Sequence, residues 1–349
     1  EVWLDRGEPE RMVSEGLRQE GHAVTMASLD ADAVRIFHAA NFRCDRALVI
    51  VTGAFDEGAV ARYVDHIVAA AGSLHDVHVV LDCANGAMSS VAPVAFERCG
   101  ARVTVLHAAP DGRNINLACG ATDVASLSAA VVETGAHLGL AFDGDGDRVI
   151  AVDHLGRTVD GDRLIALAAL RLRDDGALHH DTVVVTVMSN IGFHRAMAAA
   201  GVNVVTTAVG DRYVLEALEA GGFSIGGEQS GHIIYCDLAT TGDGLLAGVR
   251  LARYVHDSGE TLAASADRVM VGYPQVLLNV RVAERHPHAA NELADEIAAA
   301  EQELGGDGRV LVRASGTEPL IRVMVEAATD AVATSVAERL AAVVAARFG

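Results

Sequence analysis

The chain has 349 residues, of which 51% are hydrophobic, and its formal net charge is −20 at pH 7. This length exceeds one ordinary hydrophobic core and predicts roughly two to four domains, while the apolar content is too high for a disordered protein. The negative charge repels polyanions, so we expect no nucleic-acid partner, and any anionic ligand needs a local pocket of cations or amide groups.

No apolar run approaches the roughly 18 residues that a membrane span requires, and the opening residues EVWLDRGEPERM show no secretory leader. We therefore expect a soluble, cytoplasmic protein with no membrane partner. The cysteines are scattered, odd in number and never in C-x-x-C spacing, which argues against disulfides and against a zinc site. They are Cys44, Cys83, Cys99, Cys119 and Cys236.

From residue 74 onward, β-rich apolar runs alternate with glycine-bearing loops and helical stretches. VHVVLDC (77–83) precedes a helical segment and the run ARVTVLHA, and the same pattern returns at 182–208. This alternation is typical of an α/β fold with partly parallel strands. After about residue 272, three strand-like runs and two long helical segments predict a small α+β domain.

The predicted boundaries divide the chain into four segments. Residues 1–73 hold two helices and one short strand-like run, too little for a complete α/β domain. Two α/β domains are expected at 74–178 and 179–271, and the α+β domain at 272–349.

The loop AFDGDGDRVI (141–150) carries Asp143, Asp145 and Asp147 on alternate residues. In an extended segment these side chains point to one side, and the glycines let the backbone curl. Three like charges that close together favour a hard divalent cation over a solvated acidic turn. We therefore predict an Mg²⁺ site with open coordination positions, as a catalytic metal requires.

Two further loops offer groups for a phosphorylated ligand. GGEQSGH (226–232) contains Glu228, Ser230 and His232, which suit hydrogen bonds to a polyol. His232 is either a general acid or base or a surface imidazole. RASGTEPLIR (313–322) joins a guanidinium, hydroxyls and backbone amides in a cradle for phosphate, although a plain hairpin loop is the alternative. Its candidate residues are Arg313, Ser315, Gly316, Thr317 and Arg322.

Three smaller features fit a phosphate-ester site: Arg148 after the acidic loop, Arg212 in VGDRY, and TTGDG at 240–244. For Arg212 alone, an ion pair with Asp211 or another neighbour is the simpler interpretation. The fingerprints of dinucleotide-binding, P-loop and hydrolase-elbow proteins are absent from the sequence.

Taken together and in this order, the motifs resemble those of the α-D-phosphohexomutase family, and most closely its bacterial members that act on hexosamine phosphates. The motifs are LDCANGA, FDGDGDR, VGDRY, GEQSGH, TTGDG and RASGTEPLIRVMVE, and the similarity runs from about Leu74 to the C-terminus. The resemblance implies three α/β domains of shared topology and a smaller C-terminal domain around a central cleft.

The resemblance also implies roles for individual residues. The three aspartates would hold Mg²⁺, Arg148 would face the reacting phosphate, and the GEQSGH residues would contact the sugar hydroxyls. The residues of RASGT would grip the phosphate that is not reacting, and Arg212 and Arg322 join the expected substrate-binding set. A sugar phosphate is the expected ligand, with a nucleotide-like metabolite as an alternative, and a homodimer is also considered.

Family members carry a phosphoserine in a first-domain loop, which donates and recovers the phosphoryl group. Aligning the strand-like RALVIV and the following TGAFDEG with that loop puts Ala54 at the position of the serine. An alanine methyl cannot carry a phosphoryl group. Asp56 is then a candidate nucleophile, because aspartyl phosphates are known intermediates, and Thr52 is a weaker one.

Three functions follow from this pattern. The leading hypothesis is an Mg²⁺-dependent phosphatase, in which His232 or a carboxylate moves the proton. The alternative is a phosphohexose mutase that uses Thr52, Asp56 or a sugar bisphosphate as donor. The third hypothesis is a phosphosugar-binding protein without catalysis.

Overall fold

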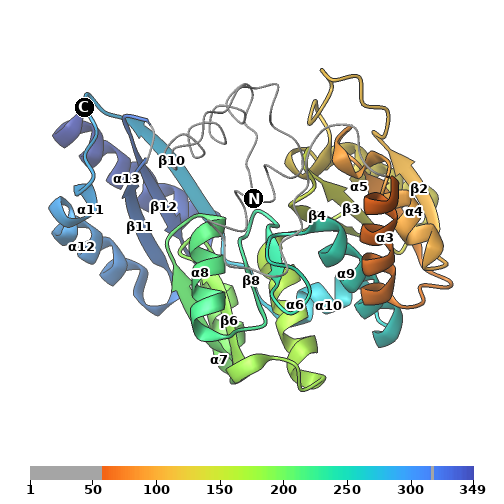
Figure 1. Ribbon diagram of the computed structural model, residues 1–349. Helices are drawn as coiled ribbons and strands as arrows, with labels where there is room; N and C mark the ends of the chain where they lie inside the picture. Colours follow the sequence, from red (N-terminus) through yellow and green to blue (C-terminus); the bar gives the residue numbers. More distant parts are fainter. Residues whose placement is uncertain (1–56, 316–317) are drawn as a thin grey trace, which may run out of the picture.

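The computed structural model describes residues 57–315 and 318–349, which form two α/β units and one α+β unit in chain order (Figure 1). Residues 1–56 and 316–317 lie outside the described residues. The predictions for Thr52, Ala54, Asp56, Gly316 and Thr317 therefore stay predictions.

The first unit is a five-stranded sheet in the order β2-β1-β3-β4-β5. Strand β1 runs parallel to β2 and β3, whereas β4 and β5 are antiparallel additions. Alternate residues face opposite sides: Val80 packs against α5, and Val79 joins the core under α3 and α4. The bounds are β1 (His78–Asp82), β2 (Arg102–Leu106), β3 (Leu138–Phe142), β4 (Val149–Asp153), β5 (Thr158–Val159), α3 (Glu57–Ala71), α4 (Ala92–Arg98) and α5 (Ala125–Thr134).

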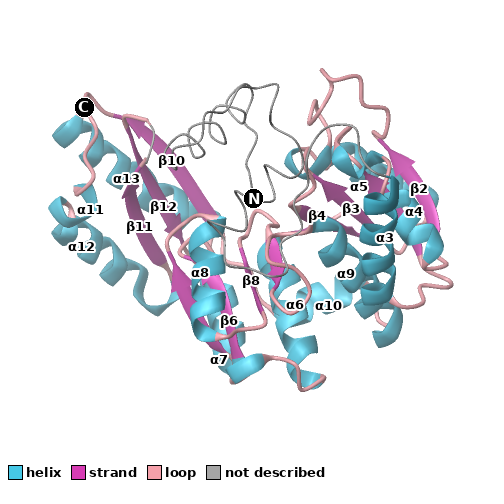
Figure 2. Ribbon diagram, viewed as in Figure 1, coloured by secondary structure: helices cyan, strands magenta, loops and turns pink. Residues whose placement is uncertain are grey.

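The second unit repeats this strand pattern in the order β7-β6-β8-β9, with β6 parallel to β7 and β8 and with β9 antiparallel. Figure 2 shows its helices beside the sheet. The bounds are β6 (Thr182–Thr186), β7 (Asn203–Thr207), β8 (Ile225–Gly227), β9 (Ile233–Tyr235), α6 (Gly161–Asp174), α7 (Ile191–Ala199) and α8 (Asp211–Gly221). The alternation of apolar runs and helical stretches therefore predicts the partly parallel strands correctly.

Helix α9 (Gly244–Ser258) joins the two units. It follows β9 in the chain, yet it packs against α3 and against β3 and β4 of the first sheet. Helix α10 (Leu262–Val269) packs against α6. One hydrophobic core consequently runs through both units.

The third unit has its own core and an antiparallel sheet in the order β10-β12-β11. The long helix α13 (Asp330–Phe348) packs on β10 and β12 (Figure 2). The small α+β domain predicted from the sequence is thereby confirmed. The remaining bounds are β10 (Gln275–Arg281), β11 (Arg309–Ala314), β12 (Leu320–Glu326), α11 (Ala289–Glu292) and α12 (Ala294–Leu304).

Cys83, Cys99 and Cys119 are free and buried, as the sequence predicts, and Cys236 is half-buried. Cys44 lies outside the described residues. No helix in the described part of the chain is long and apolar enough to cross a membrane.

The second and third units meet at the N-terminus of α7. The Asn190 amide donates to Asp162 Oδ2 at 2.8 Å, and the Ile191 amide donates to Glu326 Oε2 at 2.9 Å. Arg309 pairs with Glu326 at 3.0 Å. Two buried carboxylates from different units thus satisfy the free N–H groups of one helix end.

Burial raises the pKa of Asp162 to about 7, and the nearby Asp160 and Glu326 add to this shift, although the bond from Asn190 opposes it. The folded state therefore holds this proton more tightly than the unfolded state does. Its contribution to stability is complete below about pH 4 and is lost as the pH rises towards 7.

Replacing Asp162 with Asn should remove this pH dependence, because the amide does not titrate and its oxygen can still accept from Asn190. From pH 4 to pH 8 the unfolding free energy of the wild type should fall by a few kcal/mol more than that of Asp162→Asn. Urea unfolding at both pH values measures the difference. The exposed Asp174→Asn on the same helix is the control, and a parallel pH response in wild type and Asp162→Asn would contradict the assignment.

Candidate active site

The acidic loop connects two buried strands, β3 and β4. Gly146 has φ +80°, and a Cβ there would lie 2.2 Å from the Met88 methyl carbon. A Cβ at Gly144 would lie 2.6 Å from the side chain of Ile115. Position 146 therefore needs glycine, whereas a side chain at Gly144 would have to displace the end of Ile115.

Oxygens of Asp143, Asp145 and Asp147 lie within 4.8 Å of one another. Asp143 and Asp147 are buried and Asp145 is exposed. Burial, followed by the charges of Asp147 and Asp145, raises the pKa of Asp143 to about 8. Asp147 Oδ1 is buried and accepts no hydrogen bond from the described residues. These features fit a divalent cation. The cation would replace the proton that Asp143 holds and would bind the unpartnered Oδ1 of Asp147.

Arg148 stands at the rim of this loop. Its Nε lies 3.6 Å from Asp147 Oδ1 and 3.8 Å from Asp143 Oδ2, and the side chain is half-buried. The guanidinium is therefore placed beside the carboxylates, where an anionic ligand of a bound cation would arrive.

His232 connects the acidic loop to the second unit. Its Nδ1 lies 3.1 Å from Asp147 Oδ2, and the Gly242 amide donates to its Nε2 at 3.2 Å. Because Nε2 accepts, Nδ1 carries the proton and donates to Asp147. Burial alone would raise the pKa of Asp147, but His232, with Asp143 and Arg148, holds it below its usual value.

This arrangement differs from the sequence expectation for His232. The side chain is 2% exposed and both ring nitrogens are engaged, so it is neither a surface imidazole nor open to a sugar. It lies instead against the Asp147 carboxylate, and its expected role as a general acid or base stays a prediction. The sequence could not reveal this buried position, because the partners of His232 lie 85 and 10 residues away.

The TTGDG segment supports the same loop. Asp243 caps α9 by accepting from the Leu246 amide at 2.9 Å, and the Tyr63 hydroxyl donates to its carboxylate at 3.0 Å. The Gly244 amide donates to Gly146 O at 3.0 Å. The start of α9 thus holds the backbone of the acidic loop. An aspartate three residues before Leu246 was a readable capping signal, whereas the contribution of Tyr63 was not.

The sugar loop lies between β8 and β9, and we use this name for residues 228–232. The Gly210 amide donates to Glu228 Oε1 at 3.1 Å, and Ser230 Oγ lies 3.5 Å from Glu228 Oε2. Gly231 has φ +94°, and a Cβ there would lie 2.2 Å from Val149 O. The loop therefore rests directly on the strand that follows the acidic loop.

Arg313 and Arg322 face each other on paired strands β11 and β12. Both side chains are half-buried, and their buried Nε atoms make no hydrogen bond with the described residues. Burial and then the charge of Arg322 lower the pKa of Arg313, while the carboxylate of Glu228 acts in the opposite sense. Two adjacent cations near the sugar loop provide a site for a doubly charged anion.

The other predicted residues take different positions. Ser315 is buried at the end of β11, and its Oγ accepts from the Glu318 amide at 3.3 Å. Arg212 is 80% exposed and pairs with Glu216 at 2.7 Å, one helical turn away, rather than with Asp211. The geometry of Arg212 therefore fits the ion-pair interpretation.

Three models of one family match the chain in order. They are phosphoglucomutase/phosphomannomutase alpha/beta/alpha domain II at residues 61–156, domain III at 160–273, and the C-terminal domain at 277–343. The chain therefore belongs to the phosphoglucomutase/phosphomannomutase family, as its motifs indicate.

Among the relatives are phosphoglucosamine mutases. The protein of Frankia alni is 54% identical over 291 residues, which are 83% of this chain and 64% of the relative. That of Rhodococcus jostii is 53% identical over 289 residues, 82% of this chain and 65% of the relative. The chain spans less than two thirds of the length of these relatives.

Solved structures share the fold. A phosphoglucomutase/phosphomannomutase family protein of Burkholderia thailandensis has a TM-score of 0.69 at 23% identity, covering 82% of this chain and 65% of that one. The Aspergillus fumigatus N-acetylphosphoglucosamine mutase was solved with GlcNAc-6P and magnesium. It has a TM-score of 0.70 at 21% identity, and the match covers 86% of this chain and 68% of that one.

These comparisons change the order of the functional hypotheses. They favour the mutase alternative, give no support to the leading phosphatase interpretation, and indicate no nucleotide. The matched models begin at residue 61, so the assignment of Ala54 to the serine position stays a prediction.

Arg313→Met should stabilise the free protein and abolish its response to phosphate. Removing one of two facing cations relieves repulsion of about 0.5–1 kcal/mol. Urea unfolding with and without inorganic phosphate measures both effects. Arg281→Met, an exposed arginine on β10, is the control and should keep the phosphate response. Phosphate stabilisation that survives in Arg313→Met would contradict the site.

Proposed function

We propose that this chain acts on hexosamine phosphates as a phosphoglucosamine mutase, moving a phosphoryl group between the 6- and 1-hydroxyls of the sugar. One observation carries the proposal: His232 of the sugar loop bonds to Asp147, which brings the sugar loop against the acidic loop. We assign the cation to the acidic loop, the polyol to the sugar loop and the phosphate to the arginine pair. The identity of 53–54% to phosphoglucosamine mutases supports the choice within the family.

In this proposal, Asp143, Asp145 and Asp147 hold Mg²⁺, a cation that prefers oxygen ligands. When bound, the ion neutralises charge on the phosphoryl group being transferred. Arg148 binds the oxygens of that same phosphoryl group from the rim of the loop. His232 fixes Asp147 through the bond from its Nδ1.

Residues outside the acidic loop hold the rest of the substrate. Arg313 and Arg322 bind the phosphate that is not reacting, and Glu228 and Ser230 bond to the sugar hydroxyls. Isomerisation requires a bisphosphate stage: one hydroxyl gains a phosphoryl group from a donor, and the other then returns one. The number of phosphoryl groups on donor and sugar is therefore unchanged at the end. Thr52, Asp56 and an added sugar 1,6-bisphosphate are the candidate donors.

The aspartate cluster predicts opposite effects of one substitution with and without magnesium. Asp145→Asn should raise the melting temperature of the metal-free protein, because it removes one of three like charges. It should also weaken Mg²⁺ binding at least tenfold, so that magnesium stabilises the wild type far more than the variant. Thermal unfolding across a magnesium titration measures both, with the exposed Glu133→Gln as control. Equal magnesium responses in wild type and Asp145→Asn would exclude the site.

The activity itself is tested by ³¹P NMR of glucosamine 6-phosphate incubated with the protein and Mg²⁺, with and without hexose 1,6-bisphosphate. We expect glucosamine 1-phosphate to form, and Asp145→Asn to slow its formation at least about 100-fold while Glu133→Gln does not. Turnover only with added bisphosphate identifies that donor, and turnover lost in Asp56→Ala identifies the aspartate. Release of inorganic phosphate without isomerisation, or no turnover at all, would overturn the proposal.

A further inference from the structure

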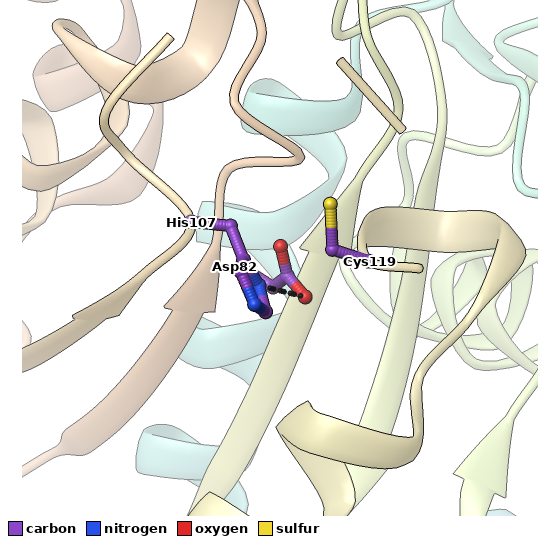
Figure 3. Close-up of side chains that lie close together, drawn as sticks. All are labelled: Asp82, His107 and Cys119. Atoms are coloured by element: carbon purple, nitrogen blue, oxygen red, sulfur yellow. Dashed lines mark ion pairs between the residues drawn. The ribbon is translucent and has the colours of Figure 1, made fainter. Parts of the chain in front are cut away.

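A second group of metal-ligating side chains lies outside the site described above. Asp82 is the last residue of β1, His107 directly follows β2, and Cys119 precedes the short 3₁₀ helix η3 (Gly120–Thr122). One ligand atom from each lies within 4.8 Å of the other two. Figure 3 shows the Asp82 carboxylate beside the His107 ring, with Cys119 next to them, on three separate segments.

We propose that Asp82, His107 and Cys119 bind one divalent cation of the zinc class. The donor set carries the proposal, because a carboxylate oxygen, an imidazole nitrogen and a thiolate sulfur together suit a borderline-soft ion. The three aspartates of the acidic loop offer only hard oxygen donors, which suit Mg²⁺. The two clusters therefore select different ions.

The hydrogen bonding of His107 and Cys119 supports a bound ion. His107 Nδ1 lies 3.0 Å from Asp82 Oδ2 as an ion-pair contact, and this buried nitrogen makes no hydrogen bond with the described residues. Cys119 is fully buried, and its sulfur accepts a weak hydrogen bond from the Asn85 side-chain amide at 3.9 Å and another from the Leu117 backbone. A cation between these groups would satisfy both.

The carboxylate is already oriented for such a role. The Ala84 amide donates to Asp82 Oδ1 and the Gly120 amide to Oδ2, both at 3.0 Å. Each oxygen keeps a further lone pair for a metal, and hydrogen bonds of this kind fix the direction of a ligand. The side chain of His107 is 31% exposed, which gives an ion a way in.

Binding requires only a small contraction and the loss of a proton. In a tetrahedral zinc site neighbouring ligand atoms lie about 3.5 Å apart, and here the three ligand atoms lie within 4.8 Å of one another. Burial, together with the charges of Asp82 and Asp123, raises the pKa of the Cys119 thiol, so the ion displaces its proton. Water would complete the coordination.

The site would tie together the loops that support the acidic loop. The Asn116 amide donates to Ala84 O, and the Ala87 amide donates to Gly144 O, both at 2.9 Å. A cation held by Asp82 and Cys119 therefore braces the segments on either side of these bonds. The expected consequence is a more stable first unit.

The test uses Co²⁺ as a spectroscopic substitute for zinc, added to the chelator-treated full chain in excess Mg²⁺, which occupies the acidic loop. The wild type should bind one equivalent and develop a near-ultraviolet thiolate-to-cobalt absorption. Competition with Zn²⁺ then gives its affinity. Cys119→Ser should lose the absorption, and both Cys119→Ser and His107→Asn should bind Zn²⁺ at least about 100-fold more weakly.

Cys236→Ser, at a half-buried cysteine outside the cluster, is the matched control and should behave as the wild type. Circular dichroism establishes that each variant is folded, and the partly exposed His107 supplies a second test if Cys119→Ser fails to fold. The inference is overturned if the wild type shows no thiolate absorption, or if Cys119→Ser and His107→Asn keep the wild-type affinity.

Discussion

The mutual repulsion of three aspartates in one short loop is the constraint on which the site depends. Their oxygens lie within 4.8 Å of one another, and two of the three side chains are buried. Burial of like charges is costly unless protons or cations compensate. Here His232 donates to Asp147, Arg148 lies across Asp143 and Asp147, and Asp143 has a pKa of about 8. The remaining imbalance is what a divalent cation would relieve.

The contacts that stabilise the acidic loop also join the units of the fold. His232 belongs to the second unit but stabilises a carboxylate of the first, and the start of α9 holds the backbone of the acidic loop through Gly244. Glu228 of the sugar loop opposes the lowering of the pKa of Arg313, in the third unit, by burial and Arg322. The groups proposed to bind cation, sugar and phosphate therefore come from all three units. This explains why a single α/β unit would not supply the site.

Much of this was readable from the sequence, where the signal is local. The strands around the acidic loop are continuous apolar runs, and alternation of aspartate with glycine places the carboxylates on one side. Three features depend on distant residues and were not readable: the buried position of His232, the packing of α9 against α3, and the meeting of Asp82, His107 and Cys119. The absence of C-x-x-C spacing argued against a zinc site, but ligands from two strand ends and one loop need no short motif.

The proposed function requires a cation in the acidic loop and a sugar phosphate to occupy one site. Mn²⁺ accepts the same oxygen ligands as Mg²⁺ and is paramagnetic, so it broadens the ³¹P signal of any phosphate bound close to it. The direct measurement is the ³¹P line width of glucosamine 6-phosphate with protein and Mn²⁺. The account predicts strong broadening in the wild type that disappears in Asp145→Asn and persists in Glu133→Gln. Broadening that is absent from the wild type, or unchanged in Asp145→Asn, would contradict it.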